Sequence, residues 1–480
     1  MKKIFYLAVL SLAFLSCDED DITLRPHNAV GEDLVLKNIN DFENAVRGAY
    51  VYMYRRGGEF GYGGEFLIDT EVMTDNLIYS PQGRGTNLDG FRWTSTASSP
   101  HFDYFESAYR SSDMASKIIM NLGVLPADQQ RNNVEGEARF IRALSHFDLV
   151  RSYSKIPSQG GDALQSLGMT YLTAPDVPGN PTRPTVADTY QQILDDLLKA
   201  KDLINADNGV ANGRASKSAV YALLSRVYLY MGDYQNVLNY GQLAIDNASG
   251  AMGTIASGAT FVNLWNDANV NGVLFKLRIQ DIDLIIPGTV YLQGSASARK
   301  SEYVVSKEFF SLFSTTDIRK TAYTATSNFA GKAYNHVIKY DGRTSGTANV
   351  VDIKVLRIEE VYLNMAEAQY KLNGGGLNYL DVVRSKRYTP FVSGGETGTA
   401  LWSAIMLERR LELAFEMDRF FTLKRLNLPM DRSATDGHFA DGTGVPATTT
   451  HIDAGDFRWQ MPIPQYIRDI NPDFQQNPQY

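Results

Sequence analysis

Apolar residues recur at helical spacing over most of this chain, in segments separated by glycine, proline and polar stretches. The stretch 38–53, NINDFENAVRGAYVYM, follows this spacing behind Asn40, a candidate N-cap. The segments FESAYRSSDMASKIIMNLGVL and NVEGEARFIRALSHFDLVRSY predict a helix pair, separated by Pro126 and ended before Pro157. Further helices are expected in TVADTYQQILDDLLKAKDLI, SKSAVYALLSRVYLYMGDYQNVLNYGQLAI and WSAIMLERRLELAFEMDRFFTLKRL. The pattern therefore predicts a mostly α-helical fold.

One helical segment also carries a repeat signature. Its residues fall at the offsets of a tetratricopeptide helix-turn-helix unit: Leu224, Tyr228, Gly232, Asp233, Tyr234, Tyr240 and Ala244, with Val237 at the usual alanine position. A looser copy, RIEEVYLNMAEAQYKLNGGGLNYLDVVRSKR, places its turn at Asn373-Gly374, where the glycine run is expected to end a helix. Two copies predict a solenoid-like scaffold in which helix pairs stack on one another.

Two long segments interrupt the helical pattern. Residues 56–101 contain RRGGEFGYGGEF and SPQGRGTNLDGFRW, and residues 250–350 add strand-like GVLFKL and DLIIPGTVYL among glycine and polar stretches. Loops of this length are uncommon without a function. We therefore expect one domain over 17–480, with binding regions in the two loop-rich segments. Its helical repeats are expected at about 38–55, 102–153, 185–248, 353–388 and 400–427.

The N-terminal segment is expected to be an export signal. A positive start, Met1-Lys2-Lys3, precedes an apolar run from Ile4 to Leu15 and then Ser16-Cys17. Its 12 residues are too few to span a bilayer, which needs about 20. A small residue followed by cysteine is typical of bacterial lipoprotein signals, in which the thiol accepts a diacylglycerol. Residues 1–16 are therefore predicted to be a signal peptide and Cys17 the lipidated residue; a secretory peptide with a chance cysteine is the alternative.

Composition limits the possible partners. Hydrophobic residues make up 44% and charged residues 21% of the 480 positions, which is ordinary for a folded globular chain. The formal net charge of −8 becomes −10 without Lys2 and Lys3, and such a surface repels phosphate backbones, so nucleic acid is not an expected partner. Cys17 is the only cysteine, so no intramolecular disulfide can form.

No catalytic, cofactor or metal motif is present. The six histidines lack HxxxH or HExxH spacing, and neither a P-loop nor a GxSxG motif occurs. The stretch DRSATDGHFADG at 431–442 offers oxygen ligands but lacks the glycine and glutamate of an EF-hand, which leaves calcium there open. We therefore expect no catalytic residue, no cofactor and no metal site.

Three glutamates could suggest acid/base chemistry. The spacing of Glu408, Glu412 and Glu416 would place them on one face of a helix. A glycoside hydrolase needs two carboxylates close together, so this spacing could suggest such an enzyme. Arginines at 409, 410 and 419 are interleaved with them, and neighbouring helices carry Arg142 and Arg357. The favoured interpretation is a structural ion-pair network.

Loop aromatics are the candidate ligand contacts. A sugar ring stacks its C–H face on an aromatic plane, while its hydroxyls need polar partners. Residues of this kind in the two loop-rich segments are Tyr62, Asp75, Asn76, Tyr79, Arg84, Trp93, Trp265 and Tyr291. Tyrosines at helical spacing, such as Tyr221 and Tyr230, are expected in the core instead.

Several segments together resemble one family, the SusD/RagB-like outer-membrane lipoproteins of Bacteroidetes. They are EARFIRALSHFDLVRSYSKIP, GRASKSAVYALLSRVYLYMGDYQNVLNYGQLAI, VLRIEEVYLNMAEAQYKL, ERRLELAFEMDRFFTLKRL and MPIPQYIRDINPDFQQNPQY, in family order. Two departures lie in scaffold motifs: YSKIP replaces the usual YGxxP, and FEMDRFFTLKRL lacks a frequent glycine. The resemblance covers almost the whole chain after residue 17.

The resemblance implies both a fold and a function. It implies four tetratricopeptide-like helix pairs that support a looped ligand-binding half, without catalytic activity. Such proteins are lipid-anchored in the outer membrane, cover a TonB-dependent barrel transporter (SusC-like) and capture oligosaccharides or, in some members, peptides. The acidic residues Asp18, Glu19, Asp20 and Asp21 resemble the surface-export signal of these lipoproteins, which implies a position facing the cell exterior. Peptide cargo, a glycoside hydrolase and an assembly adaptor remain the alternatives.

Overall fold

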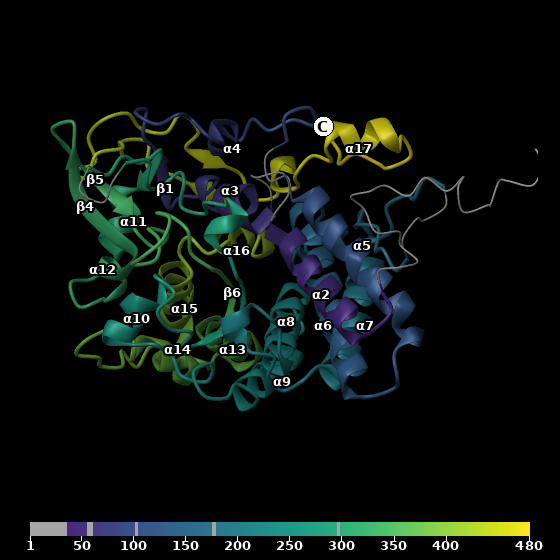
Figure 1. Ribbon diagram of the computed structural model, residues 1–480. Coiled ribbons are helices and arrows are strands. Elements are labelled where there is room, and N and C mark those ends of the chain that lie inside the picture. The colour runs from purple at the N-terminus through teal and green to yellow at the C-terminus, as the bar shows by residue number, and fades with distance from the viewer. Residues whose placement is uncertain (1–35, 55–60, 101–103, 175–178, 295–297) are drawn as a thin grey trace, which may run out of the picture.

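A computed structural model gives the fold of the chain (Figure 1). It describes residues 36–54, 61–100, 104–174, 179–294 and 298–480. The predicted signal peptide, the lipidation site Cys17 and the acidic residues Asp18, Glu19, Asp20 and Asp21 lie outside the described residues.

Long helices form one half of the molecule, as the periodicity predicted. In chain order they are α2 (Ile39–Tyr54), α5 (Phe105–Asn121), α6 (Gln129–Tyr153), α7 (Val186–Leu203), α8 (Lys217–Met231), α9 (Tyr234–Asp246) and α13 (Ile358–Asn373). The helices α14 (Leu377–Arg384), α15 (Gly398–Glu412) and α16 (Arg419–Arg425) follow α13 in the sequence. Successive members from α5 to α9 pack on one another, α2 packs on α5, and α13 packs on α9. The prediction of a mostly helical, repeat-like scaffold is confirmed.

The tetratricopeptide-like unit is formed by α8 and α9. Gly232 ends α8 with a φ of 76°, a left-handed conformation that glycine adopts without steric cost. Asp233 then caps α9 by accepting a hydrogen bond from the backbone N–H of Asn236. The rings of Tyr228 and Tyr240 stack across the pair with centroids 5.4 Å apart. The Gly-Asp pair therefore forms the tight turn that the repeat signature predicted.

Short elements and irregular segments form the other half. The short helices are α3 (Glu65–Val72), α4 (Leu88–Arg92), α10 (Gly258–Leu264), α11 (Lys307–Leu312), α12 (Arg319–Tyr323) and α17 (Gln465–Ile470). The strands are β1 (Leu77–Tyr79), β2 (Val273–Leu277), β3 (Tyr303–Val305), β4 (Thr324–Phe329), β5 (Lys332–Val337), β6 (Ile353–Arg357), β7 (Met430–Asp431) and β8 (His451–Ile452). They pair antiparallel as β1 with β3, β2 with β6, β4 with β5, and β7 with β8.

Two local expectations differ from the structure. The first loop-rich segment contains α3, β1 and α4, because its apolar residues are buried against other parts of the chain. The cap of α2 is Asn38 rather than Asn40, since the side-chain oxygen of Asn38 accepts the backbone N–H of Asn40 at 3.0 Å.

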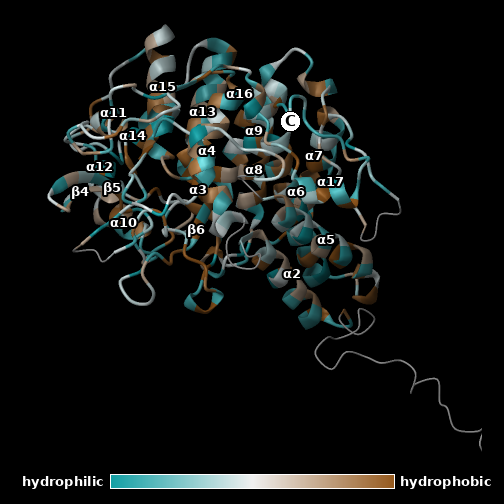
Figure 2. Cartoon of the chain, turned by 90° about the horizontal axis from the view of Figure 1, so that it is seen from above, coloured by the Kyte–Doolittle hydropathy of each residue, from teal (hydrophilic) through white to brown (hydrophobic). Residues whose placement is uncertain are grey.

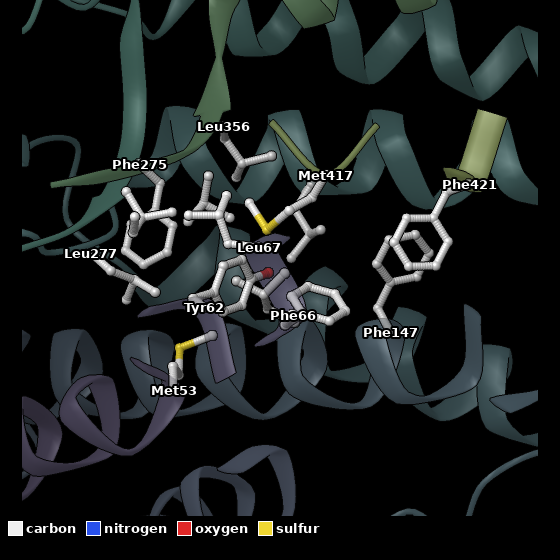
Figure 3. Packing of buried hydrophobic residues seen from close by; sticks show 14 of the residues in the cluster. Met53, Tyr62, Phe66, Leu67, Phe147, Phe275, Leu277, Leu356, Met417 and Phe421 are labelled. Atoms are coloured by element: carbon white, nitrogen blue, oxygen red, sulfur yellow. The ribbon is translucent and has the colours of Figure 1, made fainter. Parts of the chain in front are cut away.

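One continuous hydrophobic core joins the two halves. Figure 3 shows Tyr62 and Phe66 from the α3 region between Met53 and Phe147 of the long helices and Phe275, Leu356 and Met417 of the other half. In Figure 2 apolar and polar residues alternate along the long helices, as expected where only one side of a helix faces a core. The loop-rich segments are thus fixed to the helical scaffold by packing.

Candidate ligand-binding surface

The eight predicted ligand contacts do not share one exposed surface. Tyr62, Asn76, Trp93, Trp265 and Tyr291 are 0–5% exposed, and Asp75 is 8% exposed. Tyr79 is partly exposed and Arg84 is exposed. Because a sugar ring stacks only on an aromatic face that solvent reaches, burial argues against ligand contact by the four buried aromatics, which are packing residues in this structure.

The buried aromatics have protein partners instead. The indole N–H of Trp93 donates to the carbonyl of Met73 at 3.0 Å, and its ring meets that of Trp459 edge-on at 4.8 Å. The ring of Tyr291 stacks on Tyr340 at 6.0 Å. The hydroxyl of Tyr62 donates to the carboxylate of Asp148, and Trp265 meets the ring of Tyr323 edge-on at 5.3 Å. These contacts hold the loop-rich half together.

Asp75 and Asn76 also have structural roles. Arg419 donates to both carboxylate oxygens of Asp75, at 2.8 and 2.6 Å, and Arg410 lies 3.1 Å from one of them. Burial alone would raise the pKa of Asp75, but the two guanidinium groups outweigh it and lower that pKa to about 2. The side chain of Asn76 donates to Glu71 at 3.1 Å and accepts from Arg410 at 2.9 Å. Both residues therefore anchor the start of β1.

The loop that follows β1 is held in one shape by Glu302. The fully buried carboxylate of Glu302 accepts hydrogen bonds from Arg84 at 3.1 Å, from the backbone N–H of Thr86 at 2.8 Å and from the Thr86 hydroxyl at 3.0 Å. The side-chain amide of Gln293 donates to the same carboxylate. A Cβ at Gly83 would lie 2.6 Å from Cγ of Glu302, so only glycine fits there. The loop is therefore preorganised.

The same loop presents varied polar groups to solvent. Tyr79 packs against Tyr303 with ring centroids 5.7 Å apart and stays partly exposed. Arg84 and Asp89 are exposed, and Asn87 is half-buried. Tyr79, Arg84 and Asp89 offer a phenol ring, a guanidinium and a carboxylate within residues 79–89, which is the chemistry that sugar hydroxyls and ring faces need. We call residues 79–89 the β1 loop surface.

Sequence reasoning missed the residue that fixes this loop from the far end of the chain. Arg432 is buried, and its guanidinium donates to the carbonyls of Val72, Thr74 and Phe91 at 2.8, 2.9 and 2.8 Å, and to that of Thr449 at 3.0 Å. Its guanidinium carbon also lies 4.0 Å from the centroid of the Phe91 ring. No local motif marks Arg432, because its partners Val72, Thr74 and Phe91 are about 340–360 residues away in the sequence.

The glutamates that could suggest acid/base chemistry are committed to ion pairs. Glu412 accepts from Arg387 at 2.7 Å, from Arg357 at 2.8 Å and from Arg319 at 3.1 Å. Burial would raise the pKa of Glu412, but Arg387 and Arg357 hold it well below its usual range. The predicted structural network is confirmed for these residues.

Two details of that network differ from the prediction. Helix α15 ends at Glu412, so Glu416 lies beyond it in a turn where Phe415 and Met417 have positive φ values of 67° and 63°. Four of the five expected arginines take no part: Arg142 pairs with Asp196, Arg409 with Asp418, and Arg410 and Arg419 with Asp75. Spacing at i, i+4 and i+8 therefore did not place the three carboxylates on one helix.

The parts of the chain that the structure describes contain no group of three or more histidine, cysteine or carboxylate side chains that could hold a metal ion. Within the same residues, no helix combines the length and the apolar character that crossing a membrane requires.

Comparison with known proteins gives consistent matches along the whole body of the chain. A family model described as starch-binding and associating with the outer membrane matches residues 39–229. The SusD family model matches residues 233–480. The SusD-like protein P2 of Formosa agariphila is 24% identical over 519 residues, with 96% of this chain and 97% of that protein covered.

Solved structures share the fold. A SusD superfamily protein from Bacteroides thetaiotaomicron superposes with a TM-score of 0.79 at 25% identity, over 92% of this chain and 100% of the other. Another from Bacteroides vulgatus gives a TM-score of 0.80 at 24% identity, over 93% and 100%. A laminarin binding SusD-like protein gives 0.70 at 18% identity, over 93% and 100%. With its helical-repeat scaffold, its loop-rich second half and a family model that spans half of its length, the chain belongs to the SusD family.

Proposed function

We propose that this protein is a non-catalytic, lipid-anchored glycan-binding protein of the outer cell surface, which captures oligosaccharide for a TonB-dependent outer-membrane transporter. Family membership and the outer-membrane association in the matching family description support this proposal. The laminarin binding of one structural relative supports a glycan as the ligand. Anchoring through Cys17 and display outside the cell rest on the sequence pattern.

The observation that carries the proposal is the β1 loop surface. Glu302 binds residues within this loop and Arg432 binds residues on either side of it in the sequence, so its shape does not depend on a ligand. A preformed loop loses little conformational entropy on binding, so its exposed groups can contribute their interaction energy to affinity. Tyr79 would stack on a sugar ring, and Arg84 would donate to ring or hydroxyl oxygens. These are the two residues of the predicted contact set that remain accessible.

A glycan array with the purified protein would test this function. We expect hits among neutral oligosaccharides, and isothermal titration with the best hit should show about tenfold weaker binding for Tyr79→Ala and Arg84→Ala. Arg47→Ala is the matched control, because Arg47 is exposed on α2 and lies outside the loop-rich segments. Unchanged affinity in both loop variants would remove the β1 loop surface as the site.

Two further measurements test the rest of the proposal. We expect prolonged incubation of purified protein with the bound glycan to yield no shorter product, and turnover would contradict a non-catalytic role. The Cys17→Ala protein should leave the outer-membrane fraction on high-salt washing, and its retention there would contradict the lipid anchor. Co-purification with a barrel transporter in native membranes would identify the partner.

A further inference from the structure

A second recess lies away from the β1 loop surface. It is an open cleft of about 700 Å³ between the residues that follow α10, the ends of β2 and β6, and the segment around 343. None of the residues 79–89 lines it. In Figure 1, α10 lies at the lower left while α4, next to the β1 loop surface, lies along the upper edge. The cleft is therefore a separate site from the one proposed above.

Ion pairs form the floor of the cleft. Lys276 lies 2.6 Å from one oxygen of Asp352, and Arg343 lies 2.6 Å from the other. Arg343 also reaches Asp267 at 2.9 Å, and Lys354 pairs with the second oxygen of Asp267 at 2.5 Å. Two carboxylates thus face three cations.

The carboxylate oxygens of the floor are already engaged. Backbone N–H groups add to the ion pairs, since Ile279 donates to Asp352 at 3.0 Å and Asp352 donates to Asp267 at 2.9 Å. Each of the four oxygens therefore accepts at least one bond from the protein. The acidic lining residues Asp267, Asp281 and Asp352 balance the basic residues Lys276, Arg278 and Arg343 in number. Any preference for a ligand with acceptors of its own therefore depends on donors in the cleft that have no protein partner.

Arg278 supplies the free donors. It follows β2 directly, lines the cleft and is exposed, and its guanidinium makes no ion pair or hydrogen bond with any residue that the structure describes. Its backbone is closely packed, because a Cβ at Gly213 would lie 3.0 Å from the Arg278 Cβ. The Arg278 guanidinium is therefore held at its base, and its donors remain available to a ligand.

An apolar group completes the cleft. Ile282 lines it and is 80% exposed, and Leu284 beside it is 77% exposed with a φ of 57°. Exposed aliphatic side chains at the rim can cover the ring carbons of a ligand whose charged group reaches the floor. The cleft therefore combines unsatisfied cationic donors with an apolar wall.

We propose that this cleft binds the anionic group of an acidic saccharide, either the carboxylate of a uronic acid or a sulfate ester. The guanidinium fork of Arg278 matches both groups and forms charge-assisted hydrogen bonds with them, and Arg343, which is 27% exposed, is the second contact. Ile282 covers the sugar ring. The saccharide nature of the ligand rests on the proposed function, whereas the preference for an anion rests on the cleft alone.

Isothermal titration of the full-length mature protein with defined probes tests this proposal. The probes are tetragalacturonate, its methyl ester, and a sulfated carrageenan tetrasaccharide. We expect binding of at least one anionic probe at 50 mM NaCl, at least tenfold weaker binding of it at 500 mM NaCl, and, for the carboxylate, at least tenfold weaker binding of the ester. The stronger of the two anionic probes identifies the charged group.

Variants locate the binding to the cleft. Arg278→Ala should weaken binding of the anionic probe at least tenfold. Arg278→Lys should weaken it less, because lysine keeps the positive charge but lacks the two parallel donors of the guanidinium group. Ile282→Ala should weaken it modestly, and Arg47→Ala, with the same change of charge on α2, should have no effect. Equal affinity in Arg278→Ala and wild type, or no binding of either anionic probe, would overturn the proposal.

The design separates the two sites. One outcome is that Arg84→Ala loses neutral-glycan binding while the wild type binds no anionic probe. That outcome refutes anion binding in the cleft and supports the proposed function. The other outcome is that the protein binds no neutral glycan but binds the anionic probe through Arg278. That outcome supports anion binding in the cleft and refutes the β1 loop surface as a glycan site.

Discussion

The ammonium nitrogen of Lys339 lies 3.9 Å from the centroid of the Trp265 ring, within a fully buried layer. Tyr323 faces the same nitrogen at 3.8 Å, and Lys339 also donates to the carbonyl of Ala414 at 2.8 Å. The two rings thus take the place of water around a buried charge. Trp265 stabilises the packing of α10 against α12 and is unavailable to a ligand.

Trp265→Ala should therefore reduce stability. We expect a loss of about 3–5 kcal/mol from the cavity and the exposed charge of Lys339. Urea denaturation followed by circular dichroism measures it. Trp402→Ala is the control, because Trp402 is only half-buried against Tyr370 and should cost less. A Trp265→Ala protein with wild-type stability and weakened glycan binding would contradict this role.

Asp75 should make stability depend on acid pH. Its folded pKa of about 2 lies below the usual aspartate value of 3.8, so its contribution to stability is present above about pH 4 and is lost as pH falls towards 2. The shift corresponds to roughly 2 kcal/mol. The stability difference between wild type and Asp75→Asn should therefore shrink as pH falls from 5 to 2.5.

Urea titrations across that pH range measure the difference. Asp473→Asn, the same change of side chain at an exposed position, is the matched control. A constant difference for Asp75→Asn would show that the Asp75 ion pairs do not produce the pH dependence.

Arg432→Met should loosen the β1 loop surface. The substitution leaves four buried carbonyls without their donor, which we expect to cost at least about 3 kcal/mol. Hydrogen exchange should accelerate in residues 72–92, and glycan affinity should fall. Arg92→Met, at an exposed position next to the same loop, should leave exchange unchanged. If residues 72–92 of Arg432→Met exchange their amide hydrogens as slowly as those of the wild type, Arg432 does not hold the loop in place.

The glycine run between α13 and α14 should tolerate substitution at one position but not at another. Gly374 and Gly376 have φ values of 77° and 113°, but only at Gly376 would a Cβ meet an obstacle, the carbonyl oxygen of Ala366 at 2.4 Å. We expect Gly374→Ala to cost about 1 kcal/mol and Gly376→Ala at least twice as much. Thermal unfolding of the two variants compares them directly, and equal costs would rule out the steric explanation.

The helical fold was predictable because its signals are local. Periodicity marked the long helices, and Gly232-Asp233 marked the turn of the repeat unit. The end of α15 at Glu412 was not predictable, since no glycine or proline follows it within the turn that contains Phe415 and Met417. That turn is stabilised by burial of both side chains, which is a tertiary effect.

The candidate site was only partly predictable for the same reason. Tyr79 and Trp93 are both aromatics of one glycine-rich segment. Their exposure differs because Trp459, from the far end of the chain, covers Trp93, whereas Tyr79 keeps a free edge. Composition identified the loop that carries both rings, but the contacts that decide which ring solvent can reach come from residues more than 200 positions away.

The long-range anchoring of the β1 loop by Arg432 has a consequence for biosynthesis. Val72, Thr74 and Phe91 emerge from the ribosome hundreds of residues before Arg432, whose guanidinium donates to their carbonyls. The scaffold from α5 to α9 can assemble from neighbouring helices as they are made, but the loop reaches its final shape only after the last segment arrives. A product truncated before residue 432 would carry the repeats without a shaped loop, so under the proposed function only a completely synthesised chain would bind its ligand.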